Sequence, residues 1–262
     1  MRLRTTVSAV VLIFTVWSAL FAFQRGPFGR GRFSRGEPEP MPPDADEKTE
    51  WAFARLQYPS FRGPYNWTID APAAERHFSQ GVRRLTRLHT RSVEQVVNVD
   101  TDDVYNWPWI YAVEVGYWDL TDDECKRLRD YLNRGGFLMV DDFHGTQEWA
   151  TFYRSLSRVF PDRPVVDLEN AEPIFHTLYD LNERVQVPGL AALRNGVTYE
   201  KDGIEPKWRA VFDNQGRILV AICHNMDLGD AWEHADAPWY PEKMTSLAYR
   251  IGINYIVYSM TH

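Results

Sequence analysis

The sequence predicts an α/β fold built on a doubly wound, mostly parallel β-sheet, and two observations support this class. Strand-like and helix-like segments alternate from residue 51 to residue 160, as expected for parallel strands joined by helical crossovers. The apolar run Phe137–Val140 is continuous rather than alternating, which is typical of a strand covered by helices on both faces. In such sheets, ligands bind outside the carboxyl ends of the strands, so a functional site is expected there.

The first half of the domain is predicted to contain four strands and three helices. The strands are expected at residues 53–58, 93–99, 109–115 and 136–142. The helices are expected at residues 73–88, between residues 121 and 135, and at about 146–159. The middle helix has the clearest ends, because Thr121 and Glu124 form a capping box and Gly135 can supply the left-handed residue that follows a helix.

The second half is harder to interpret. A short strand is predicted at residues 164–168, and residues 170–206 are predicted to be irregular. Residues 208–212 and 217–223 flank an Asp-Asn-Gln-Gly turn and predict a β-hairpin. A last helix is expected at about residues 241–259. The chain has no G-x-G-x-x-G, Walker or G-x-S-x-G motif.

Residues 1–48 are predicted to precede the folded domain, which is assigned to residues 49–262. Residues 1–23 have a basic start and an apolar stretch, typical of a signal peptide or an uncleaved membrane anchor. Either interpretation exports the domain to the periplasm or, if residues 5–23 stay in the inner membrane, anchors it there facing the periplasm. Residues 24–48 are rich in Gly, Arg and Pro and predict a disordered linker.

The charge of the chain is unevenly distributed. Six of the 29 basic residues and none of the 36 acidic residues precede Glu37, so the rest of the chain has 23 basic and 36 acidic residues, a net charge of −13. Nucleic acid is therefore not expected as a partner, because phosphates would be repelled.

Asp141, Asp142 and His144 directly follow the central strand and are the first candidate site. Carboxylates beside an imidazole suit a divalent metal or acid–base catalysis. The alternative is a structural turn in which Asp142 caps the next helix and His144 bonds the backbone. Consecutive side chains at a strand end point to opposite faces, and we expect Asp141 to face the ligand crevice and Asp142 to face the helix.

A second polar stretch follows the predicted hairpin. His224 is a candidate catalytic residue, and Asn225 and Asp227 are candidate ligand-binding residues; a merely polar loop is the alternative. Because His224 also follows a strand, we expect it to approach the 141–145 turn closely enough to share a ligand or a water with Asp141 or Asp142.

A third candidate is aromatic. Tyr105, Trp107 and Trp109 follow a group of aspartates and could stack on a sugar, although packing is the commoner role of such side chains.

Four segments resemble a bacterial domain of unknown function, family 4159, within the wider group of glutamine-amidotransferase-like and trehalose-utilisation-like proteins. These segments are Val115 to Thr121, Leu128 to Leu132, Gly135 to Asp142, and His224 to Gly229. The resemblance covers roughly residues 50–260 and implies a flavodoxin-like, three-layer fold. True amidotransferases place a nucleophilic cysteine on the turn after a central strand, where this chain has none. Cys223 adjoins His224 but lies on the later strand, so the resemblance does not extend to glutamine hydrolysis.

Three functions remain open at this point. The first is an exported domain that binds a small molecule such as a carbohydrate. The second is a metal-assisted hydrolase that uses the Asp/His residues, with a divalent cation as its cofactor. The third is a structural partner in a cell-envelope complex.

Overall fold

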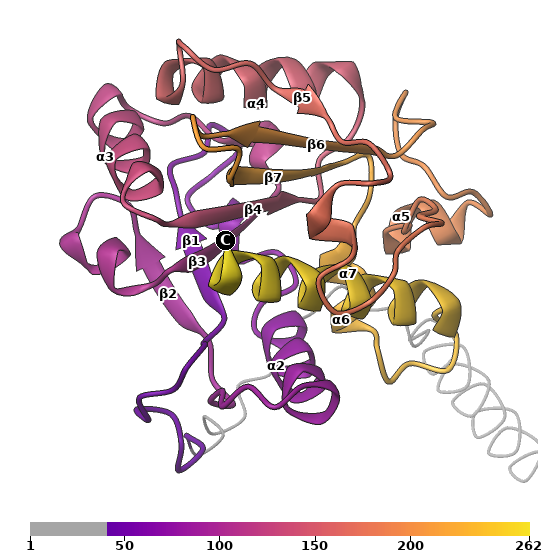
Figure 1. The fold of residues 1–262 in the computed structure, drawn as a ribbon. Coiled ribbons are helices and arrows are strands. Elements are labelled where there is room, and N and C mark those ends of the chain that lie inside the picture. Colours follow the sequence, from indigo (N-terminus) through magenta and orange to yellow (C-terminus); the bar gives the residue numbers. More distant parts are fainter. Residues whose placement is uncertain (1–40) are drawn as a thin grey trace, which may run out of the picture. The chain divides into compact units, whose positions relative to one another are not determined.

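The computed structural model describes residues 41–262, and seven strands in this part of the chain form one sheet in the order β2-β1-β3-β4-β7-β6-β5 (Figure 1). The predicted signal peptide or anchor and most of the predicted linker lie outside the described residues. The strands are β1 (Ala54–Gln57), β2 (Gln95–Asn98), β3 (Trp109–Val113), β4 (Phe137–Asp141), β5 (Val166–Asp167), β6 (Lys207–Phe212) and β7 (Ile218–His224).

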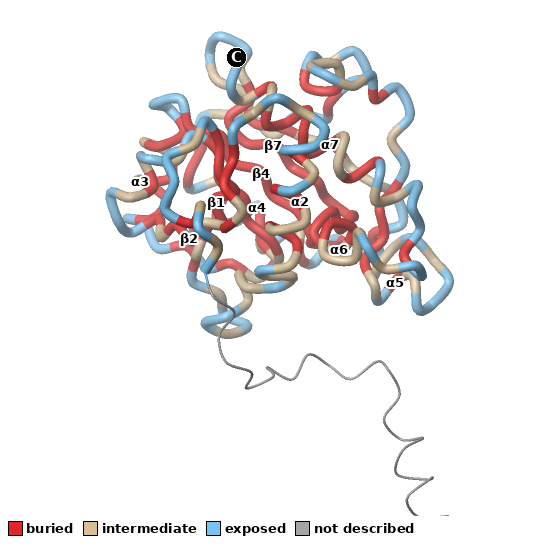
Figure 2. The backbone as a smooth tube through the Cα atoms, turned by 90° about the horizontal axis from the view of Figure 1, so that it is seen from below, coloured by how far each residue is buried: buried red, intermediate tan, exposed pale blue. Residues whose placement is uncertain are grey.

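The pairing confirms the predicted α/β class with a mostly parallel sheet. The five strands β2, β1, β3, β4 and β7 are parallel to one another. The hairpin β6–β7 and the short edge strand β5 are antiparallel. All residues of β3, β4 and β7 are buried, which explains why their sequences are apolar almost throughout (Figure 2).

Helices cover both faces of the sheet. The helices are α2 (Ala73–Leu85), α3 (Asp122–Asn133), α4 (Gly145–Val159), α5 (Leu190–Arg194), α6 (Leu228–Glu233) and α7 (Glu242–Thr261). One apolar core joins the sheet to α2, α6 and α7, and a second joins it to α3 and α4. Among residues 41–262, no helix has both the length and the apolar character needed to cross a bilayer.

Local chemistry explains the best-predicted element. Thr121 accepts a hydrogen bond from the Glu124 amide, and the Glu124 carboxylate accepts one from the Thr121 amide, so the predicted capping box opens α3. Gly135, just beyond α3, has a φ of 109°, a conformation that glycine adopts without strain. The helix α6 was not predicted, because its six residues are too few to display a helical period.

One part of the predicted linker is ordered. The carboxylate of Asp44 accepts hydrogen bonds from the amide and hydroxyl of Ser92, at 2.9 and 2.8 Å, and pairs with Arg83. The ordered part of the chain therefore includes residues that the sequence assigned to the linker.

Candidate functional site

Asp141 ends β4 and is fully buried. Its Oδ2 atom accepts hydrogen bonds from the Leu228 amide at 2.7 Å, the Gly229 amide at 3.1 Å and the Tyr111 hydroxyl at 3.0 Å. Asp141 is thus the carboxylate that binds helix amides, at the start of α6, and the predicted assignment of Asp141 to the crevice and Asp142 to the helix was wrong. The alternation along β4 is the reason: Phe137 and Met139 face the core that contains α6, and Asp141 continues that face.

Asp142 leaves the strand in a left-handed conformation with a φ of 51°. Its Oδ1 atom lies 3.2 Å from His144 Nε2. His144, rather than Asp142, holds the position before the first residue of α4, and neither side chain caps that helix. The alternative of a structural turn in which Asp142 caps the next helix therefore fails, because Asp142 is paired with His144 instead.

The imidazole of His144 is buried, and its Nδ1 atom has no hydrogen-bond partner among the described residues. Burial lowers the pKa of His144 and raises that of Asp142 well above its ordinary value, with Asp230 and Glu200 adding repulsion to Asp142. The pair is therefore a neutral imidazole beside a carboxyl group that retains its proton easily.

A further carboxylate, Asp70, reaches this edge from the segment that follows β1. The guanidinium of Arg55, on β1, donates hydrogen bonds to the carbonyls of Trp67 and Ile69 at 3.0 and 2.9 Å and pairs with Glu75 of α2. These bonds fix the backbone just before Asp70, whose own φ is 64°. The Asp70 Oδ2 atom is buried and has no hydrogen-bond partner among the described residues.

Asp70 meets two carboxylates from the beginning of α6. Asp227 caps this helix by accepting a hydrogen bond from the Asp230 amide at 2.7 Å. One carboxylate oxygen from each of Asp70, Asp227 and Asp230 lies within 4.8 Å of the other two. Asp230 also belongs to a second group of the same kind with Glu233 and His234.

The electrostatics of this carboxylate cluster (Asp70, Asp227 and Asp230) are unfavourable for three ionised groups. Burial raises the pKa of Asp70 and of Asp227 well above the ordinary value, and neighbouring carboxylates raise both further. Burial and Asp142 raise the pKa of Asp141 to about 7. Adjacent carboxylates can be accommodated either by protons or by a cation, and three hard oxygen donors suit Ca²⁺ or Mg²⁺.

His224 approaches the 141–145 turn as predicted, because β7 pairs directly with β4. Its Nε2 atom lies 3.2 Å from the Gly145 carbonyl, and its ring lies 4.8 Å from that of Phe143. However, His224 continues the face of Val220 and Ile222, in the core that contains α4. The cavity of about 420 Å³ that His224 lines includes neither Asp141 nor Asp142, so the expected shared cavity is not found.

The surroundings of His224 fix the tautomer and the protonation state of its imidazole. Because the Gly145 carbonyl can only accept, Nε2 carries the proton, and Nδ1 accepts from the Arg209 guanidinium at 3.4 Å. Burial, with the Arg209 charge, lowers the pKa of His224 to about 4. Arg209 is itself held by Asp167 at 2.7 Å and by the Trp149 ring at 4.2 Å.

Asn225 serves as a structural tie. Its Oδ1 atom accepts from the Gly145 amide at 2.8 Å, its Nδ2 atom donates to the Glu205 carbonyl at 2.7 Å, and its backbone has a φ of 66°. All of these contacts are to protein backbone, so the ligand-binding role predicted for Asn225 remains a prediction without support in this geometry.

The aromatic candidates lie elsewhere. Trp109 begins β3 and is buried in the core, 5.3 Å from Trp51 and 5.2 Å from Phe53 between ring centroids. Tyr105 and Trp107 line a cavity before the amino ends of β3 and β4. This end of the sheet is opposite to the carboxyl edge, so the structure does not bring the three aromatics together with the Asp/His candidates.

Sequence reasoning missed Asp70, and it included Asp230 in the polar stretch after the hairpin without singling it out. Asp227 and Asp230 have the spacing of a helix cap, a signal that could have located α6. Nothing in the local sequence marks Asp70, because only the pairing of β1 into the sheet brings it to α6.

Comparison with known proteins gives a family but no activity. A search of curated proteins finds no match to this chain. The family described as Domain of unknown function (DUF4159) matches residues 52–260, which include every strand, all helices except the last residue of α7, and all members of the carboxylate cluster. The chain therefore belongs to the DUF4159 family.

Proposed function

We propose that this domain binds a divalent cation through Asp70, Asp227 and Asp230, and that the cation holds an oxygen-rich ligand at the carboxyl edge of the sheet. The observation that carries the proposal is the mutual approach of the three carboxylate oxygens within 4.8 Å. Two oxygens that share one Ca²⁺ at 2.3–2.6 Å are at most about 5 Å apart, so the three side chains can reach a common ion.

Two further features of the site support a cation. The fully buried Asp141 leaves its Oδ1 atom without a partner among the described residues and adds to the repulsion that raises the pKa of Asp227. Among the described residues, the only basic side chain in an ion pair with a cluster member is His234, 3.5 Å from Asp230. A bound cation would offset the negative charge of these carboxylates at any pH, whereas protons would do so only below the raised pKa values of the cluster.

The class of ligand follows from the chemistry of such an ion. Calcium and magnesium are completed by oxygen atoms of waters or ligands, so a molecule rich in hydroxyl or carboxylate groups, such as a carbohydrate, suits the open positions. The basic and apolar amino terminus supports an exported location, where free calcium can occupy weak sites with dissociation constants of about 10⁻⁴ to 10⁻³ M. The wider likeness to amidotransferases remains part of this proposal, as a divergent domain without the cysteine nucleophile: both cysteines are buried, and burial raises the pKa of each thiol.

Calorimetric titration of the full-length chain with CaCl₂ and MgCl₂ tests the proposal. We expect saturable binding of one of the two ions, a higher unfolding temperature in its presence, and loss of both effects in Asp70→Asn and Asp227→Asn. Asparagine keeps the helix cap at position 227 and tolerates the left-handed backbone at position 70. The exposed Asp123→Asn variant is the matched control. Absence of binding by the wild type, or binding by the two cluster variants that equals that of the wild type, would contradict the proposal.

The Asp142–His144 pair favours a second function, hydrolysis by acid–base catalysis. A neutral imidazole oriented by a carboxyl group can take a proton from water, and the Nδ1 atom of His144 is the unpartnered nitrogen. A panel of chromogenic ester and glycoside substrates tests this function, with His144→Gln as the inactivating variant. Turnover that persists in His144→Gln would reject the pair as the catalytic group.

A further inference from the structure

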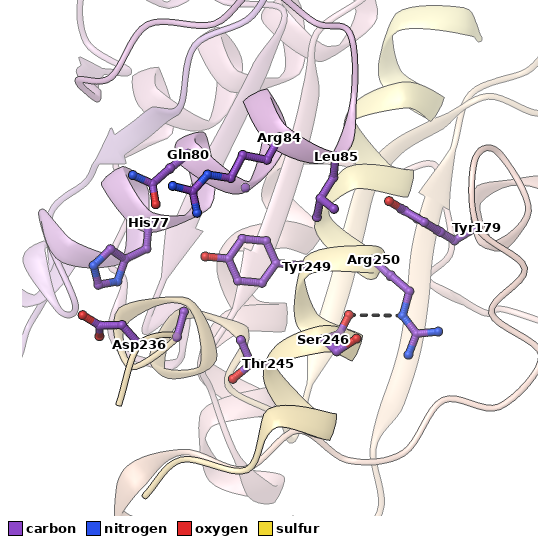
Figure 3. Close-up of a pocket in the computed structure, with 12 residues that line it drawn as sticks. His77, Gln80, Arg84, Leu85, Tyr179, Asp236, Thr245, Ser246, Tyr249 and Arg250 are labelled. Carbon is purple, nitrogen blue, oxygen red and sulfur yellow. Dashed lines mark hydrogen bonds between the residues drawn. The ribbon is translucent and has the colours of Figure 1, made fainter. Parts of the chain in front are cut away.

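A groove lies between α2 and α7. Its volume is about 760 Å³, within the range of 300–1,000 Å³ that is typical of small-molecule sites. The two helices contribute most of the lining, and Tyr179 and the segment after α6 contribute the rest (Figure 3). None of the residues of the carboxylate cluster lines this groove.

Tyr249 forms the floor of the groove. Its ring packs directly on Gly81 of α2, where a Cβ atom would lie 2.1 Å from Tyr249 Cε1. The ring therefore depends on the absence of a side chain at position 81. Within residues 41–262, the Tyr249 hydroxyl forms no hydrogen bond, and Figure 3 shows it pointing along the groove between His77 and Arg84.

The charges of the groove differ from those of the domain. Arg84 on α2 and Arg250 on α7 both line it, and within the described residues neither forms an ion pair; Arg250 donates only to the Ser246 carbonyl, at 3.2 Å. Asp236 is the one carboxylate in the lining. Figure 3 draws the Arg84 guanidinium on the same side of the Tyr249 ring as its hydroxyl, and the Arg250 guanidinium beyond Ser246, away from that hydroxyl. An unpaired guanidinium beside Tyr249 is unexpected in a domain whose net charge is −13 over residues 37–262.

The lining of the groove has both polar and apolar parts, which suits a ligand with a polar group and an apolar body. Arg84 acts on the Tyr249 hydroxyl: burial raises the pKa of Tyr249, Asp236 raises it further, and the Arg84 charge lowers it. Leu85, half exposed, and Tyr179 add apolar surface. His77 is already engaged, since its Nδ1 atom lies 3.0 Å from the carbonyls of Trp232 and Glu233, and it forms a wall rather than a free donor.

We propose that this groove binds a small organic anion, whose carboxylate or phosphate group is held by Arg84 and whose body packs on Tyr249. Guanidinium groups present a planar fork of donors that matches both kinds of anion. The Tyr249 hydroxyl supplies a further donor in the floor of the groove. The proposal does not depend on the cation site, which lies on other residues.

Nuclear magnetic resonance titration of the full-length chain with benzoate and with phenylphosphate tests the proposal, with benzyl alcohol as the neutral control. We expect saturable shifts of backbone amides in α2 and α7 for at least one anion, at least fivefold weaker binding in Arg84→Gln, and a smaller loss in Arg250→Gln. The anion that binds more tightly distinguishes a carboxylate ligand from a phosphate ligand. Arg154→Gln, an exposed arginine on α4, should bind as the wild type does.

Three outcomes would overturn the inference. They are the absence of saturable shifts in α2 and α7 with both anions, equal affinity for benzyl alcohol, and unchanged affinity in Arg84→Gln. Urea unfolding of each variant serves as the folding check. If an arginine variant were unstable, Tyr249→Phe would replace it, and that variant should weaken anion binding while the ring packing on Gly81 is kept.

Discussion

The carboxylates on the two sides of the sheet, at the ends of β4 and β7, differ in whether they have cationic partners. On the α4 side, Glu148 pairs with Lys201, Glu205 with Lys207 at 2.9 Å, and Asp167 with Arg209 at 2.7 Å. On the α6 side, the cluster of Asp70, Asp227 and Asp230 has no lysine or arginine partner among the described residues. These three carboxylates on the α4 side thus have cationic partners, whereas the cluster on the α6 side requires protons or a cation.

This difference separates a structural role from a functional one. His224, which the sequence favoured as a catalytic residue, has both ring nitrogens occupied by protein groups. Asp70, which the sequence did not single out, has a buried oxygen without a partner. A buried polar atom without a hydrogen-bond partner destabilises the fold unless a water, an ion or a ligand binds it. The α6 side is therefore the better candidate for a ligand-binding site.

Arg55→Met should produce the largest effect, because it breaks the support of the α6 side. Arg55 and Glu75 are both almost fully buried, and removal of one partner of such a pair costs about 3–5 kcal/mol. The same change releases the carbonyls before Asp70, so cation binding should weaken as well. Urea unfolding and calorimetry measure the two effects, with Arg154→Met as the exposed control. A stability loss no larger than that of the control would show that Arg55 does not support this side.

Asp227→Asn should stabilise the cation-free protein, increasingly so as the pH rises. The folded-state pKa of Asp227 is raised, so its favourable contribution is complete below the unfolded pKa near 4 and is lost as the pH rises through the folded value. The uncharged variant lacks this loss, and we expect its gain in the free energy of unfolding over the wild type to grow steadily from pH 4 to pH 8.

Urea unfolding of both proteins in a chelator, at several pH values, measures that gain. Asp123→Asn should show no such trend, because its carboxylate is exposed. A constant difference between wild type and Asp227→Asn would mean that the cluster does not repel itself.

Lys201→Met removes the cationic partner of one carboxylate, Glu148, on the α4 side. It leaves the buried Glu148 without its cation, although Glu148 keeps the His144 amide at 2.6 Å as a donor. Because Lys201 is partly exposed and water can replace it, we expect a loss of only about 1 kcal/mol in the free energy of unfolding. Cation affinity should be unchanged, and a change of more than twofold would show that the two sides are coupled.

Asp44→Ala should have the smallest effect, because Asp44 lies in the ordered part of the predicted linker. Its bond to Arg83 is partly exposed, so we expect a loss of about 0.5–1 kcal/mol. Deletion of residues 1–41 should cost less than deletion of residues 1–48, which also removes Asp44. Equal unfolding midpoints for the two deletions would contradict a structural role for residues 42–48.

The sequence by itself determined the fold class and most of the sheet. Continuous apolar runs mark β4 and β7, and the capping box marks α3, because these signals depend only on neighbours in the chain. It also located the carboxyl edge, since parallel strands all end there. The family of the chain was likewise predicted from four of its segments and is confirmed over residues 52–260.

The tertiary structure alone decided which side chains meet. The alternation of side chains along β4 points Asp141 toward the α6 amides, whereas the alternation along β7 points His224 toward α4. Asp70 joins Asp227 and Asp230 because Arg55 fixes the segment after β1 against the start of α6. Such meetings depend on strand pairing and backbone conformation between segments far apart in the chain, and local sequence patterns do not encode them.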